Sequence, residues 1–313
     1  MANRRIGIWL IGAKGGVAAT SIVGLAALKK GLIGSAGLVS ELPVFARLDL
    51  AAWDELVVAG HDIRDVRLAD EAMRMHTESR AIDAGIIEAC REELEAVDAR
   101  IRPGTVINVG STIEKLAGDA DLARGETPRD AIARVQRDLR EFVEASGLDQ
   151  LVVVNVASTE PPVEASRLPS TWAELSDQLD SPDTCPLSAS SLYAIAALDL
   201  GFPYVNFTPS LGSAAAAICE LATLRGTCHV GRDGKTGETL LKCTLAPMFA
   251  QRNLEVMSWV GHNIFGNMDG VVLDDPANKQ TKVASKDRLL GQIFGYQPQT
   301  LVSIEYIKSL GDW

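Results

Sequence analysis

The N-terminal segment combines an apolar run, a glycine-rich loop and an alanine-rich stretch, and this order limits the folds open to the chain. The run RIGIWLIG, residues 5–12, is almost continuously apolar, which is typical of a strand buried on both faces of a parallel sheet. Residues 17–31, VAATSIVGLAALKKG, are rich in alanine and leucine and close on Lys-Lys-Gly, so they predict a helix. A strand, a glycine turn and a helix in succession open a dinucleotide-binding unit.

The loop GAKGG between these elements departs from strict G-x-G-x-x-G spacing, because Lys14 and Val17 stand at two of the glycine positions. Gly12 still permits a tight turn, and Gly15 and Gly16 leave room for a pyrophosphate to approach the backbone N–H groups of the helix N-terminus. The loop therefore predicts NAD binding, and the alternative is a plain turn without a ligand.

A carboxylate that binds the ribose of such a cofactor should follow the second strand. Glu41 and Asp49 lie in the stretch after the first predicted helix, and both are candidates from the residues alone. The sequence does not choose between them.

Strand and helix patterns alternate through the first two thirds of the chain. Thr127 and Pro128 predict the N-cap and first residue of a helix over residues 127–146. The other patterns are strands at TVINVG (105–110), LDQLVVVNVAST (148–159) and FPYVNFTPS (202–210), and helices over residues 79–97 and 188–201. This alternation predicts an α/β fold. We expect a Rossmann-like NAD-binding domain, residues 1–209 plus 290–313, and a second α+β catalytic and oligomerisation domain, residues 210–289.

Charge and composition exclude several classes of partner. The net charge of −11 argues against nucleic acid or an anionic membrane. The five cysteines form no Cys-x-x-Cys pair, and no metal-ligand spacing stands out. The apolar runs are too short to span a bilayer, and the N-terminal run meets no small-residue cleavage site, so a cytoplasmic protein is expected.

The segment GRDGKTGETLLK, residues 231–242, contains the Gly-Lys-Thr of a phosphate-binding P-loop. His229 stands where that loop requires its first glycine, so the ATP-loop interpretation fails. Lysines gather in this half of the chain, and residues 261–270, GHNIFGNMDG, are dense in glycine and amides. These groups could form a site for a phosphorylated, polyhydroxylated ligand; the alternative is a solvated charged surface.

Seven segments resemble motifs of the myo-inositol-1-phosphate synthase family, in the same order and over nearly the whole chain. HNIFGNMDG is similar to that family's SYNHLGNNDG, and TKVASK, residues 281–286, is similar to SKEISK. The other five are GAKGGVAAT, VVAGHDIRD, VASTEPP, VNFTPS and GRDGKTGETLLK. Each motif alone is modest, whereas their ordered succession is specific.

The resemblance implies an NAD-dependent isomerase that converts glucose 6-phosphate to inositol 3-phosphate by oxidation, enolisation, intramolecular aldol closure and reduction. It also implies a homotetramer built through the sheet of the second domain. Carried over position by position, the implied catalytic residues are Lys235, Lys242, Lys282, Lys286 and Asp269. The implied NAD-binding residues are Gly12, Gly15, Gly16, Val17, Ala18, Asp62, Thr159, Asp233 and Asn267. The implied substrate-binding residues are Thr208, Ser210 and Asn263.

The sequence departs from the family pattern at Arg232, Leu240 and Ile264, which replace an aspartate, a lysine and a histidine. The family pattern would also continue with a lysine directly after Trp313. Two alternatives therefore stay open: a related NAD enzyme that acts on another sugar phosphate, and an inactive NAD-binding homologue.

Overall fold

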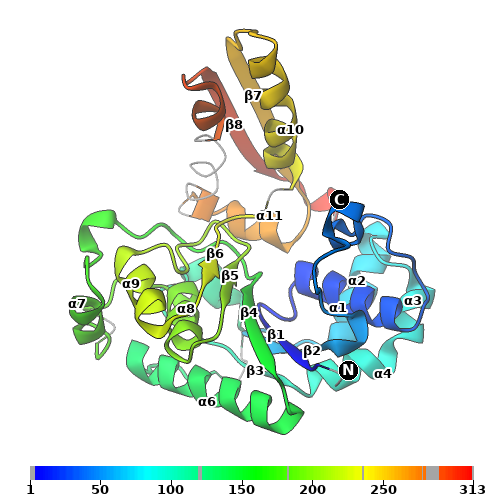
Figure 1. Cartoon of the computed structure of the whole chain (residues 1–313), viewed down its shortest axis with the longest axis vertical. Helices are drawn as coiled ribbons and strands as arrows, with labels where there is room; N and C mark the ends of the chain where they lie inside the picture. Colours follow the sequence, from blue (N-terminus) through cyan, green and yellow to red (C-terminus); the bar gives the residue numbers. More distant parts are fainter. Residues whose placement is uncertain are drawn as a thin grey trace.

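The computed structural model describes residues 4–118, 122–181, 183–234, 236–276, 278–279 and 289–311. Its centre is a six-stranded parallel sheet with the strand order β3-β2-β1-β4-β5-β6 (Figure 1). The strands are β1 (Ile6–Ile11), β2 (Leu56–Asp62), β3 (Ile101–Pro103), β4 (Gln150–Asn155), β5 (Tyr204–Asn206) and β6 (His229–Val230). This order is that of a doubly wound dinucleotide-binding fold, so the α/β expectation is confirmed.

Helices cover both faces of this sheet. One face carries α1 (Gly16–Lys29), α2 (Leu68–Ser79), α3 (Ala84–Ala89) and α4 (Arg91–Asp98). The other face carries α5 (Ser111–Leu116), α6 (Pro128–Ser146), α7 (Trp172–Asp177), α8 (Ala189–Asp199) and α9 (Ala216–Arg225). Short 3-10 helices lie at Val39–Glu41, Pro43–Phe45, Trp53–Glu55, Ala165–Arg167 and Lys308–Leu310.

Residue alternation in β1 explains why its sequence is apolar throughout. Trp9 and Ile11 point into the core beneath α6 and α8, whereas Leu10 points into the core beneath α1 and α2. Both faces of the strand are therefore buried, as parallel sheets require.

Local signals predicted α6 and α8 well. Thr127 caps α6, since its hydroxyl accepts from the backbone N–H of Asp130 at 3.1 Å, and Gly147 ends the helix with a φ of 56°. Ten of the eleven residues of α8 are buried, which explains why its sequence lacks a polar face.

Two local predictions were wrong. Residues 105–110 form no strand, because the N–H of Thr105 donates to the Tyr193 hydroxyl at 3.0 Å and β3 ends at Pro103. The helix expected over residues 79–97 is two helices, α3 and α4, which meet at Cys90.

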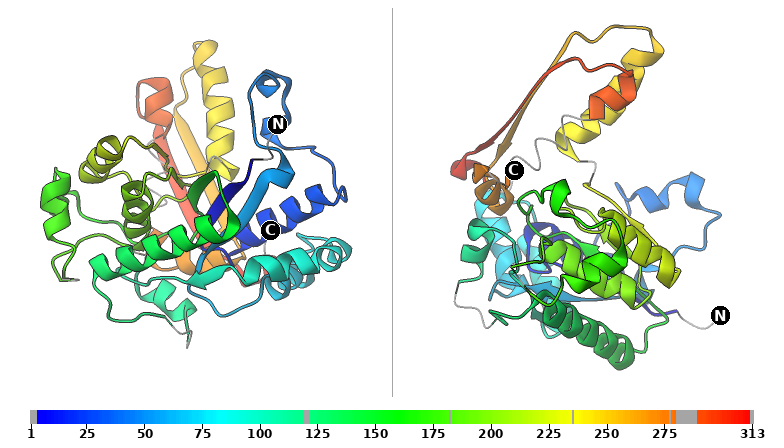
Figure 2. Two further views of the ribbon diagram at one scale, coloured as in Figure 1. Left: turned by 60° about the horizontal axis from the view of Figure 1, so that its bottom comes forward. Right: turned by 90° about the vertical axis from the view of Figure 1, so that its left-hand side faces the viewer.

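A second unit projects from the six-stranded unit as an arm (Figures 1 and 2). It contains α10 (Gly237–Gln251), β7 (Ser258–Phe265), α11 (Met268–Leu273) and β8 (Gln299–Tyr306). β7 and β8 pair in parallel along their full lengths, from Ser258 opposite Gln299 to Phe265 opposite Tyr306.

Strand pairing differs from the predicted domain division in two places. Residues 299–306 pair with β7, whereas residues 290–313 were expected in the NAD-binding domain. β6 pairs with β5, so part of the segment after residue 210 extends the first sheet. We propose a boundary between β6 and α10 in place of the one at residue 210. In the part of the chain that the structure describes, none of the helices has the length and apolar character needed to cross a bilayer.

Candidate functional site

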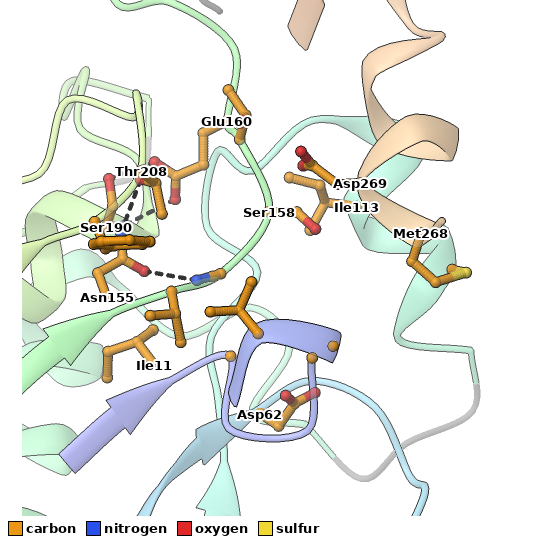
Figure 3. A pocket seen from close by; sticks show the side chains of 18 of the residues that line it. Ile11, Asp62, Ile113, Asn155, Ser158, Glu160, Ser190, Thr208, Met268 and Asp269 are labelled. Carbon is orange, nitrogen blue, oxygen red and sulfur yellow. Dashed lines mark hydrogen bonds between the residues drawn. The ribbon is translucent and has the colours of Figure 1, made fainter. Parts of the chain in front are cut away.

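A cavity lies at the carboxyl ends of β1 and β4, where the strand order reverses and ligands bind in folds of this kind. Its walls come from the glycine loop after β1, the segments after β4 and β5, and α11 of the arm. Figure 3 shows Asp269 and Met268 of α11 on the side opposite Thr208 and Ser190.

The glycine loop is built around the positive φ of Gly12, which is 80°. The N–H groups of Gly12 and Ala13 both donate to the His61 carbonyl, at 2.9 and 3.1 Å, and so tie the loop to β2. A Cβ on Gly12 would lie 2.7 Å from Cα of Ala157, closer than side-chain carbons come. The loop can therefore keep this path only with glycine at position 12.

The N-terminus of α1 lies at the cavity, directly after the glycine loop. Gly15 is the N-cap residue and lacks a side chain that could cap the helix, and α1 begins at Gly16. Gly15, Gly16 and Val17 all line the cavity. The unpaired N–H groups of a first helical turn bind anions such as a pyrophosphate.

Asp62 is the acid at the end of the second strand. Its carboxylate accepts from the N–H groups of Lys14 at 2.7 Å and Arg64 at 2.8 Å, so it joins the glycine loop to β2. Glu41 and Asp49 were wrong as ribose-binding candidates, because both precede β2. Asp49 instead pairs with Arg4 at 2.9 Å.

A buried polar network forms the cavity floor after β4 and β5. The Asn206 side-chain oxygen accepts from Asn155 Nδ2 at 3.2 Å and from the Thr208 hydroxyl at 2.8 Å. The Thr208 hydroxyl in turn accepts from the backbone N–H of Ser210 at 3.2 Å. These contacts hold the turn after β5 against the end of β4, and Thr208 faces the cavity.

Glu160 is a site residue that the sequence patterns missed. Its carboxylate accepts from the N–H of Ser190 at 2.8 Å and from the hydroxyls of Ser188 and Ser190. Its own N–H donates to the Ser210 hydroxyl at 3.0 Å. Burial raises the pKa of Glu160 despite these hydrogen bonds. The sequence signal that could have identified Glu160 is its position between a buried strand and the Pro-Pro pair that follows it.

His61 beneath the loop is neutral and structural. The Trp9 indole donates to His61 Nδ1 at 2.9 Å, and an indole can only donate. The ring proton is therefore on Nε2, which donates to Asp138 at 3.0 Å. Burial lowers the pKa of His61 although Asp138 opposes this effect.

The start of GRDGKTGETLLK reaches the cavity beside the turn after β5. Asp233 has a φ of 73° and donates its N–H to the Thr208 carbonyl at 3.0 Å. Asp233, Gly234 and Thr236 line the cavity. On the opposite wall, Asn267 caps α11 by accepting from the N–H of Gly270 at 3.0 Å.

The cavity brings together ten of the residues predicted for the site: Gly12, Gly15, Gly16, Val17, Asp62, Thr159, Thr208, Asp233, Asn267 and Asp269. Four others, Ala18, Ser210, Lys242 and Asn263, do not line it. Lys235, Lys282 and Lys286 lie outside the described residues. The individual roles of all these residues stay predictions.

Lys242 and Asn263 both contact Glu238 in the arm instead. Lys242 is fully buried, and its Nζ lies 2.7 Å from Glu238 Oε1. Asn263 Nδ2 donates to the other oxygen of Glu238 at 2.7 Å. Glu238 therefore pairs with Lys242 within α10 and connects α10 to β7 through Asn263.

The fold and the glycine loop define the class of protein: a doubly wound dinucleotide-binding protein with a ligand cavity at its strand reversal. The NAD-binding family model described as Myo-inositol-1-phosphate synthase matches residues 6–291. The chain belongs to this family, and it carries the family's NAD-binding domain.

The chain is also similar to known proteins and solved structures of this family. Inositol-3-phosphate synthase 1 of Bacteroides thetaiotaomicron is 31% identical over 94% of this chain and 69% of its own length. The structure of inositol-3-phosphate synthase from Caenorhabditis elegans superposes with a TM-score of 0.85 at 19% identity, over 99% of this chain and 66% of that chain. A myo-inositol-1-phosphate synthase-related protein from Thermotoga maritima superposes with a TM-score of 0.74 at 23% identity, over 98% of this chain and 75% of that chain.

The chain spans only part of several relatives. It covers 51% of inositol-3-phosphate synthase 1 from Oryza sativa, at 27% identity over 83% of this chain. It covers 48% of the Macaca fascicularis protein of the same name, at 29% identity over 87% of this chain.

Proposed function

We propose that this protein converts D-glucose 6-phosphate to 1D-myo-inositol 3-phosphate, with NAD as a cofactor that is regenerated in each turnover. The observation that carries this proposal is the family match over residues 6–291, combined with a cavity at the strand reversal that polar residues such as Thr208 and Asp269 line in part. The proposed reaction is that of the relatives, which are inositol-3-phosphate synthases, and the proposed site of the reaction is the cavity.

The residues around the glycine loop fit the proposed cofactor. The cradle at Gly12 would be filled by any Cβ, and the first turn of α1 faces the cavity. We assign Gly12, Gly15 and Gly16 to the pyrophosphate and Asp62 to the neighbourhood of the adenosine ribose. NAD supplies hydride acceptance and return, so the reaction needs no external oxidant.

The polar groups of the cavity suit a polyhydroxylated substrate. The Thr208 hydroxyl and the backbone of the turn after β5 can hold substrate oxygens, and Asp269 faces the cavity from the opposite wall. Every step of the proposed reaction develops negative charge on oxygen, which lysine ammonium groups stabilise. We assign this role to Lys235, Lys282 and Lys286 from the family resemblance.

Lys242 has a different place in the proposal. It is buried against Glu238 and does not line the cavity, so we propose that it orients the segment that carries Lys235. The homotetramer and the cytoplasmic location also remain proposals from the sequence.

The test is to incubate the purified chain with NAD and glucose 6-phosphate and to follow the phosphorus NMR spectrum. Inositol phosphate should form without net accumulation of NADH, and Lys286→Ala should abolish turnover while NAD still binds. An active Lys286→Ala variant would refute the assigned role of that lysine. NAD binding without any product from glucose 6-phosphate would refute the proposed reaction and favour an inactive homologue or another sugar phosphate.

A further inference from the structure

A cluster of four charged side chains lies next to Asp62, where β2 meets the cavity. Arg64 Nε lies 3.8 Å from Asp62 Oδ1, and Arg64 Nη1 lies 3.6 Å from Glu71 Oε1. Arg74 Nε lies 3.2 Å from Glu71 Oε2, and its Nη2 lies 3.0 Å from Glu71 Oε1. Arg74 also pairs with Glu78 one turn further along α2. Glu71 thus contacts both guanidinium groups.

The members of this cluster differ in their access to the cavity. Arg64 and Arg74 both line it, whereas Glu71 does not and its side chain is only 4% exposed. Glu71 therefore acts on a ligand through the two arginines. Glu78, by contrast, has a side chain that is 45% exposed, so water screens its charge.

The end of the second strand is where folds of this kind distinguish NAD from NADP. An acid there binds the ribose 2′-hydroxyl of NAD, and an arginine there accommodates the 2′-phosphate of NADP. This chain places both kinds of residue at the same point, with Asp62 beside two arginines. Taken alone, the two guanidinium groups would form a receptor for a phosphate.

The carboxylates of Asp62, Glu71 and Glu78 offset the positive charge of these two guanidinium groups. Among the described ion pairs of this cluster, Asp62, Glu71 and Glu78 set three negative charges against the two positive charges of Arg64 and Arg74, an excess of one negative charge. The side chains of Asp62 and Glu71 are both only 4% exposed, so solvent screens their charges less than the charge of Glu78. The 2′-phosphate of NADP would therefore approach two arginines whose N–H donors already face carboxylates.

We propose that Glu71 makes the cofactor site selective for NAD over NADP, because it holds Arg64 and Arg74 and balances their charge. This inference rests on the proposed NAD-dependent function. Glu71 is a positioning residue rather than a catalytic one, since it does not line the cavity and acts through Arg64 and Arg74.

The test compares NAD and NADP affinities by calorimetry in the wild-type chain and in Glu71→Gln. Glutamine keeps the size and one acceptor of the side chain but removes its charge. We expect the NADP affinity relative to NAD to rise at least about tenfold, because two arginines then face the 2′-phosphate with one less competing carboxylate. The matched control is Glu78→Gln, which removes an exposed charge from the same arginine and should change the ratio by less than about twofold.

A second variant leaves the buried carboxylate in place, in case Glu71→Gln does not fold. Arg74→Gln removes one positive charge from the cluster, so NADP affinity should fall severalfold relative to NAD. An unchanged ratio of NADP affinity to NAD affinity in Glu71→Gln would overturn the assignment of Glu71. If Glu71→Gln does not fold, an unchanged ratio in Arg74→Gln would overturn it. A wild-type chain that binds neither nucleotide would instead overturn the proposed function itself.

Discussion

Gly12→Ala is the sharpest test of the glycine loop. The backbone of Gly12 has a φ of 80°, and an L-residue in the left-handed region costs roughly 1–2 kcal/mol. The added Cβ would lie 2.7 Å from Cα of Ala157 and 3.0 Å from its nitrogen. These are backbone atoms that cannot rotate away, so overpacking adds about 1–3 kcal/mol. We expect the free energy of unfolding to fall by about 2–5 kcal/mol and NAD binding to be lost.

Gly24→Ala is the matched control for this substitution. Gly24 lies in the middle of α1, and a Cβ built there meets nothing within 4 Å. Alanine should stabilise the helix by about 0.5–1 kcal/mol and leave NAD affinity unchanged. Denaturant unfolding and calorimetric NAD titration measure both variants. A Gly12→Ala chain with wild-type stability and wild-type NAD affinity would refute the account of this loop.

Two further predictions concern buried titratable groups. Glu160→Ala leaves the donors of Ser188 and Ser190 without their acceptor, so the free energy of unfolding should fall by about 2–4 kcal/mol, whereas the exposed Glu164→Ala should change it by less than about 0.5 kcal/mol. Equal effects in denaturant unfolding would contradict the role of Glu160. Burial lowers the pKa of His61, so its contribution to stability is complete above a pH of about 6.5 and is lost as the pH falls below that value. His61→Gln should reduce the dependence of the unfolding free energy on pH in this range, and an unchanged pH profile would show that His61 is not the group responsible.

Short-range signals in the sequence determined the opening of the fold. The apolar run of β1, the glycine loop and α1 follow from burial on both faces, from a turn that requires glycine, and from helix-forming residues that end at a lysine pair. The same holds for α6, whose Thr127 cap and Pro128 first residue act within one turn. These signals succeed because each interaction joins residues that are close in sequence.

Ordered motifs also identified the family from the sequence. The glycine loop, VVAGHDIRD and VNFTPS each resemble a family motif, and the structure brings residues of all three to the same cavity. Parallel strands present their carboxyl ends at one edge of the sheet, so motifs distant in sequence converge there. The NAD assignment therefore did not depend on tertiary detail.

Only the tertiary structure decided which polar groups face the site. Asp62 rather than Glu41 or Asp49 lies at the end of the second strand, because β2 begins at Leu56, after both of those residues. Glu160 reaches the N-terminus of α8 across 30 residues of sequence, and Lys242 turns away from the cavity toward Glu238. The charge balance around Arg64 and Arg74 likewise exists only once folding brings Glu71 of α2 beside Arg64 in the segment after β2. A linear pattern contains residue types and spacings, whereas the pairing and desolvation of charges depend on contacts between segments that folding alone brings together.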